Sequence, residues 1–196
     1  MKRLMFFVCM LAMSSFAFAQ NVSPSSDWKE IQPKEITINP INLYQDWIVL
    51  AVNNEEKPNA MLLTMGTMGV FRGKPIVSIF VNESRYTYEL LQKNPYFTLA
   101  VFPEQYKESV DYLGHHSGRD GADKIKDAGL EVSKTALGNP FFEQANLVIE
   151  CRMLYTGTWD ESKLDDSIKS GFYRDNGERR PAHQQFLAEI VHVWTK

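Results

Sequence analysis

The sequence predicts a mostly β domain of the α+β class, a β-barrel with short peripheral helices. Three observations support this prediction. The chain of 196 residues has 44% hydrophobic residues and a formal net charge of -3, which is typical of one globular domain. About six or seven segments have the composition and length of strands and end at turn residues. One of them, residues 145–155, alternates apolar and polar positions with the period of a half-buried strand.

The first twenty residues are set apart by their composition. Lys2 and Arg3 precede an apolar run over residues 4–13, and Ala17-Phe18-Ala19 forms a small-x-small site before Gln20. This pattern predicts a signal peptide over residues 1–19, and the alternative is an uncleaved anchor. No later stretch approaches the roughly 20 apolar residues of a membrane helix. We therefore expect an exported, periplasmic protein with no membrane span after signal cleavage.

The next segments are an arm and the first strands. Residues 20–45 contain several serines and prolines and few periodic apolar positions, so we expect an N-terminal arm that lies over a domain of residues 46–196. The apolar runs 47–52 and 60–64 predict a hairpin, and 76–81 predicts a third strand. Because these runs are apolar almost throughout, we expect both of their faces to be buried.

Helices and strands alternate in the rest of the chain. The pattern predicts a helix at 88–93, a strand at 97–102, short helices at 104–112 and 120–128, and strands at 145–155 and 186–194. The alternation in the long strand puts Cys151 and Tyr155 on the buried face and Val148 and Glu150 on a face toward water. We expect Cys151 to be a small core residue, since free cysteine is among the most buried residue types.

Several classes of function are excluded by what the sequence lacks. With 21 Lys and Arg against 24 Asp and Glu, the chain lacks the basic surface that nucleic-acid binding needs, so no nucleic-acid partner is expected. Four histidines occur without a cysteine pair or a zinc-binding histidine pattern, so no metal site is expected. The serine-hydrolase elbow, the P-loop and the dinucleotide-binding glycine pattern are also missing.

Two segments carry groups that bind anions. Ser84-Arg85-Tyr86-Thr87 lies where a strand ends and a helix begins, so hydroxyls, a guanidinium and free backbone N–H groups would converge there. The alternative is a helix cap with a solvated arginine. Ser117-Gly118-Arg119-Asp120, followed by Lys124, is a second such cluster, which a surface loop before a helix would explain equally well.

An ordered series of segments makes the chain resemble the flavin reductase-like, flavoredoxin-type family from about Trp47 to the C-terminus. Each segment is short, and their order at compatible spacings carries the resemblance. The segments are residues 59–66, 73–75, 84–90, 94–99, 117–120 before Lys124, and 183–190.

The resemblance implies an FMN-binding split β-barrel, usually a homodimer with the flavin near the subunit interface. FMN is the expected cofactor and FAD the alternative. His183 would lie close to the flavin ring as a catalytic residue. The ring would be lined by Asn59, Ala60, Met61, Leu62, Leu63, Thr64 and Met65, and the phosphate would be held by Ser84, Arg85, Thr87, Ser117 and Lys124.

Two departures from the family bear on function. Met65 replaces an aromatic residue that is common in the family, and Ala188 replaces a glycine. Nicotinamide cofactors are cytoplasmic, so an exported member lacks the family's usual hydride donor, and the electron donor is unassigned. We expect an FMN-dependent oxidoreductase. The alternatives are a periplasmic flavin-binding or electron-transfer protein without turnover, and a split barrel with a repurposed ligand pocket.

Overall fold

The computed structural model describes residues 27–42, 48–54, 57–121, 123–172, 178–180 and 183–196. The predicted signal peptide of residues 1–19 lies outside this part of the chain. The strands are β1 (Lys29–Glu30), β2 (Ile48–Val52), β3 (Asn59–Leu62), β4 (Gly66–Phe71), β5 (Lys74–Asn82), β6 (Tyr96–Val101), β7 (Val132–Lys134), β8 (Pro140–Phe142), β9 (Leu147–Gly157) and β10 (His183–Thr195).

The helices are short. The α-helices are α1 (Tyr86–Leu91), α2 (Lys107–His115), α3 (Lys124–Asp127) and α4 (Asp166–Lys169). The 3-10 turns are η1 (Pro33–Glu35), η2 (Pro40–Asn42), η3 (Glu104–Tyr106), η4 (Gly118–Asp120), η5 (Glu161–Lys163) and η6 (Ser170–Phe172). No helix in the described ranges is long and apolar enough to cross a bilayer.

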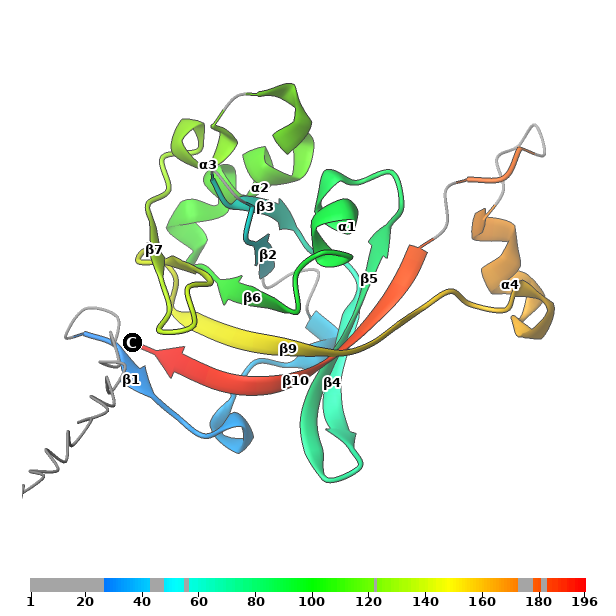
Figure 1. The fold of residues 1–196 in the computed structure, drawn as a ribbon, viewed down its shortest axis with the longest axis horizontal. Helices are drawn as coiled ribbons and strands as arrows, with labels where there is room; N and C mark the ends of the chain where they lie inside the picture. The colour runs from blue at the N-terminus through cyan, green and yellow to red at the C-terminus, as the bar shows by residue number, and fades with distance from the viewer. Residues whose placement is uncertain (1–26, 43–47, 55–56, 122, 173–177, 181–182) are drawn as a thin grey trace, which may run out of the picture.

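Eight of these strands form one antiparallel sheet that curls into a barrel, and β7 and β8 form a separate two-stranded sheet (Figure 1). Its order is β3-β2-β6-β9-β10-β5-β4, with β1 added beside β10. The two ends of this order, β3 and β4, follow each other in the chain and are connected by residues 63–65. The barrel is therefore split at this connection, and the predicted fold class, mostly β with short helices, is confirmed.

Both faces of the central strands are buried, as the sequence predicts. Ile48 and Leu50 of β2 point into the barrel core, whereas Val49 and Ala51 belong to a second core on the outer face. Figure 1 shows α2 and α3 on the side of β2 and β3. Helices thus cover the outer face, which is why these strands are apolar without alternation.

The described part of the N-terminal segment packs on the barrel. β1 pairs with the end of β10. Trp28 packs edge-on against Phe141, with 4.8 Å between the ring centres. Ile31, Ile36 and Ile38 then contact the barrel core. Residues 28–38 therefore lie along the domain, while the predicted arm boundaries at 20 and 45 fall outside the described residues.

β9 differs from its prediction on both faces. Cys151 is fully buried, as expected, but Val148 and Glu150, which were expected to face water, are also fully buried. The β7–β8 hairpin covers them, and Thr135 and Asn139 of this hairpin donate to Glu150 Oε1 at 2.5 and 2.7 Å. Tyr155, which was expected to be buried, is 54% exposed because β9 beyond Met153 pairs with β10 and has left β6.

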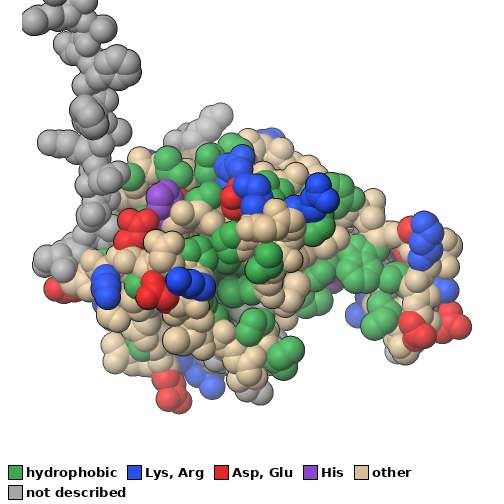
Figure 2. Space-filling view, turned by 90° about the horizontal axis from the view of Figure 1, so that it is seen from below, with side chains coloured by type: hydrophobic (Ala, Val, Ile, Leu, Met, Phe, Trp, Pro, Cys, Tyr) green, Lys and Arg blue, Asp and Glu red, His purple; other side chains and the backbone are tan. Residues whose placement is uncertain are grey.

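Two parts of the fold had weak signals in the sequence. β4 is largely exposed and contains two glycines, so it lacks the apolar alternation of a strand. It pairs with β5 through a turn in which Arg72 has φ 52° and Gly73 has φ 79°. The segment after β9 carries η5, α4 and η6 and stands away from the barrel (Figures 1 and 2).

Candidate functional site

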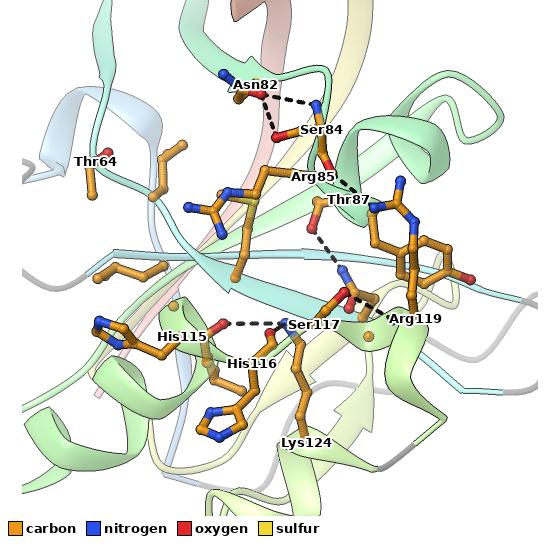
Figure 3. A pocket seen from close by; sticks show the side chains of 18 of the residues that line it. Thr64, Asn82, Ser84, Arg85, Thr87, His115, His116, Ser117, Arg119 and Lys124 are labelled. Atoms are coloured by element: carbon orange, nitrogen blue, oxygen red, sulfur yellow. Dashed lines mark hydrogen bonds between the residues drawn. The ribbon is translucent and has the colours of Figure 1, made fainter. Parts of the chain in front are cut away.

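A pocket of about 810 Å³ opens at the split between β3 and β4 (Figure 3). The connection between these strands forms one wall, and the loop into α1, the end of α2 and η4 form the others. All of the predicted site residues except Ala60 line this pocket. Ala60 is fully buried in the outer core and does not reach the pocket.

Arg119 joins the two anion-binding segments that the sequence presents separately. Its Nη1 donates to the Ser84 carbonyl at 2.9 Å, and its Nη2 donates to the Glu89 carboxylate. Its guanidinium also lies 5.7 Å from the ring centre of Tyr86. The backbone N–H of Arg119 donates to Ser117 Oγ at 3.2 Å. Arg119 therefore connects the two segments that form this wall of the pocket.

Arg85 keeps its charge free for a ligand. Figure 3 shows its side chain reaching into the pocket, and the guanidinium has no hydrogen bond or ion pair within the described ranges. The loop beneath it is fixed, because Asn82 Oδ1 accepts from the Ser84 backbone N–H at 2.9 Å and from Ser84 Oγ at 2.6 Å. A hydrogen-bonded loop thus presents a cation that is unpaired among the described residues.

Lys124 brings a second positive charge from α3. It is 6% exposed, and its Nζ donates to the carbonyls of Leu113 at 3.2 Å and His116 at 2.9 Å. Burial and the nearby charge of Arg85 lower the pKa of Lys124 to about 8, and Asp120 opposes this shift. An ammonium group has three N–H donors, so one remains for a ligand.

Asn59 and Thr87 form a buried pair in the pocket wall. Asn59 Nδ2 donates to Thr87 Oγ1 at 2.7 Å, whereas Asn59 Oδ1 has no hydrogen-bond partner among the described residues. A Cβ added at Gly118 would lie 2.2 Å from this oxygen, so a glycine is required there. The resemblance assigned Asn59 to the ring and Thr87 to the phosphate, and the fold brings both to one place.

His183 is the first residue of β10 and pairs with Asn82 of β5. It lines the pocket and is half-buried. Burial, followed by the positive charge of Arg85, lowers the pKa of His183 below its usual range. The imidazole is therefore mainly neutral at pH 7, and its place beside a flavin ring stays a prediction.

The end of α2 contributes residues beyond 112, where the predicted helix ends. His115 Nδ1 lies 2.9 Å from the Asp111 carbonyl, and the ring of His116 stacks on Tyr112 at 3.6 Å. Both pairs have the i, i+4 spacing of a helix, so a helix extended to His115 would have revealed them. Phe80 of β5 also lines the pocket. In the described ranges no group of three acidic, histidine or cysteine side chains could hold a metal.

Residues 44–196 match the flavin reductase like domain family. The chain belongs to this family. The FMN-binding protein from Thermus thermophilus, solved with bound 1-cyclohex-2-enone, is 25% identical, with a TM-score of 0.59 over 76% of this chain and 68% of that one. Flavoredoxin from Methanosarcina acetivorans is 23% identical, with a TM-score of 0.59 over 76% and 67% of the two chains.

Two further proteins are similar to this chain. The NADH:FAD oxidoreductase of Streptomyces globisporus is 18% identical, with a TM-score of 0.56 over 74% of this chain and 72% of that one, and shares the fold. An uncharacterised protein of Aeropyrum pernix is 24% identical over 149 residues, which are 76% of this chain and 48% of the relative. The chain thus spans about half the length of this curated relative.

Proposed function

We propose that the pocket binds FMN and that the protein is an FMN-dependent oxidoreductase. The observation that carries the proposal is the guanidinium of Arg85, which has no partner among the described residues and shares the pocket with Lys124 and the Thr87 hydroxyl. A phosphate monoester has a charge between about -1.5 and -2 at neutral pH and binds best to several charge-assisted donors. The relative from Thermus thermophilus is an FMN-binding protein, which supports the same cofactor.

The size and lining of the pocket fit a flavin. A volume of about 810 Å³ lies within the range of roughly 300–1,000 Å³ for cofactor pockets. Met61 and Leu62, which are partly exposed, offer an apolar wall for the ring. The bound flavin would supply the redox chemistry. Burial and the charge of Arg85 lower the pKa of His183, so the imidazole would be uncharged and would donate a hydrogen bond at the ring.

We also propose a homodimer. Large apolar side chains are exposed along the end of β9 and the segment after it, at Leu154, Tyr155, Trp159 and Ile168. The family resemblance implies a homodimer, and these exposed side chains would contact the second subunit. Sedimentation should give twice the mass of the chain, and a strictly monomeric protein would contradict the proposal.

A periplasmic electron-transfer protein is the second candidate function. The N-terminal pattern of residues 1–20 favours it, because an exported flavoprotein has no access to cytoplasmic nicotinamide cofactors. Reduction would then depend on a membrane or periplasmic partner.

Titration of the purified protein with FMN, FAD and riboflavin tests the flavin site. We expect a yellow complex with FMN, and a protein that binds neither FMN nor FAD would refute the proposal. Oxidation of NADH or NADPH by the FMN complex would favour the oxidoreductase. A complex that is reduced by dithionite but not by either nicotinamide would favour electron transfer.

A further inference from the structure

The buried side chains of Asn59 and Thr87 have hydrogen-bonding groups that remain available to a ligand in the pocket. Asn59 is 4% exposed and Thr87 is 2% exposed, and both line the pocket. Their bond of 2.7 Å, a dashed line from Thr87 in Figure 3, connects β3 to α1. It joins residues 28 positions apart, so it depends on the folded barrel.

The direction of this bond determines what the Thr87 hydroxyl can do. A hydroxyl has one proton and two acceptor lone pairs. Asn59 Nδ2 occupies a lone pair of Thr87 Oγ1, so the proton must be donated elsewhere. No described residue accepts it. Since Thr87 lines the pocket two residues after Arg85, the unspent proton and the unpaired guanidinium can meet the same anion.

Gly118 keeps the Asn59 amide in place. Any side chain at Gly118 would push against Asn59 Oδ1, at 2.2 Å from the Cβ position, and against Tyr86, at 2.9 Å. The turn of η4 can therefore lie directly on the amide because it has no Cβ there. Together Gly118 and Thr87 enclose Asn59 on both sides.

We propose that Asn59 is a positioning residue of the phosphate site. It donates to Thr87 and so leaves the Thr87 hydroxyl to donate to the phosphate monoester of the ligand. This inference rests on the proposed FMN site. The opposite orientation of the amide would have Thr87 donate to Asn59 Oδ1, with no proton left for the phosphate.

The ratio of the dissociation constants for riboflavin and FMN isolates the phosphate, because the two ligands differ only there. We expect Thr87→Val to lower this ratio by about 10- to 100-fold, and Thr87→Ser to retain it, since one charge-assisted hydrogen bond is lost in the first variant only. Asn59→Ala should lower the ratio by about 3- to 10-fold with riboflavin binding changed less than about 2-fold. The double variant should lose no more than Thr87→Val alone, because the two residues act in series.

Asn94→Ala is the matched control. Asn94 donates to the carbonyls of Asn53 and Leu90 and does not line the pocket, so its loss should leave the ratio unchanged. If Asn59→Ala does not fold, Gly118→Ala displaces the same amide and should lower the ratio too. An unchanged or increased ratio in the Asn59 variant, or additive losses in the double variant, overturns the inference alone. A wild-type protein that binds neither flavin overturns the proposed function and the inference together.

Discussion

Arg85 and Lys124 face one pocket but hold their charges differently. Arg85 has no partner within the described ranges, so its whole fork of donors is available. Lys124 already donates to two carbonyls, and burial, followed by the charge of Arg85, lowers its pKa to about 8. Arg85 would therefore contribute most of the binding free energy of a phosphate. The bound phosphate would keep Lys124 protonated.

Replacing Arg85 by alanine should weaken FMN binding by about 10- to 150-fold, since one charge-assisted contact contributes about 1.5–3 kcal/mol. Riboflavin affinity should change little because riboflavin has no phosphate. Fluorescence titration with each ligand measures both effects. Lys93→Ala, an exposed change near the end of α1, serves as the control. Equal losses for the two ligands would mean that Arg85 does not contact the phosphate.

FMN affinity should fall as the pH rises above about 8. In the free protein, Lys124 deprotonates as the pH rises past its pKa of about 8. An anion bound beside the ammonium favours the protonated form. Binding above this pH must therefore take up a proton, and the dissociation constant should rise by up to about tenfold per pH unit. The measurement is a set of titrations from pH 7 to 9.5.

Lys124→Met should bind FMN more weakly and lose this pH dependence. The same slope in this variant as in the wild type would assign the titration to another group.

At the scale of elements, β9 is secured to the β7–β8 hairpin by a buried carboxylate. Glu150 accepts from Thr135 and Asn139, and Asn139 Oδ1 in turn accepts from Asn53 Nδ2 at 3.1 Å. The network thus connects β9, the hairpin and the loop after β2. Removing its centre would leave buried donors without an acceptor.

Glu150→Ala should lower the free energy of unfolding by at least about 2 kcal/mol, because each unsatisfied buried donor costs about 1–3 kcal/mol. Glu150→Gln keeps an acceptor oxygen and should cost less. Urea denaturation measures both, with the exposed Glu131→Ala as the control. The FMN and riboflavin constants should be unchanged, since Glu150 does not line the pocket. Equal stability of the alanine and glutamine variants would mean that the network contributes little.

At the scale of the whole molecule, we expect the exported protein to begin near Gln20, because the basic residues, the apolar run and the small-x-small site occur in the required order. Mass spectrometry of the periplasmic fraction measures the N-terminus. Replacing Ala17 and Ala19 with bulky residues should block cleavage and serves as the control. Recovery of a chain with intact Met1 from the membrane fraction would contradict the prediction.

Local sequence predicted several strands and both sides of the pocket. Apolar runs of strand length predicted β2, β5 and β6, because strands that are covered on both faces have almost no polar positions. The residue types at 84–87 and 117–124 identified both sides of the pocket, since hydroxyls and cations before a helix suit an anion.

Only the tertiary structure decided which partner each side chain meets. Glu150 is buried because a hairpin from elsewhere in the chain covers its face of β9, and alternation along one strand carries no information about that cover. Arg119 binds Ser84 and Glu89, and Asn59 binds Thr87, across about 30 residues of chain. The sequence determined that the apolar runs become strands and that residues 84–87 and 117–124 carry polar and charged groups. Closure of the barrel decided that Arg119 binds Ser84 and Glu89 while Arg85 has no partner among the described residues, because hydrogen bonds form between groups that are close in space.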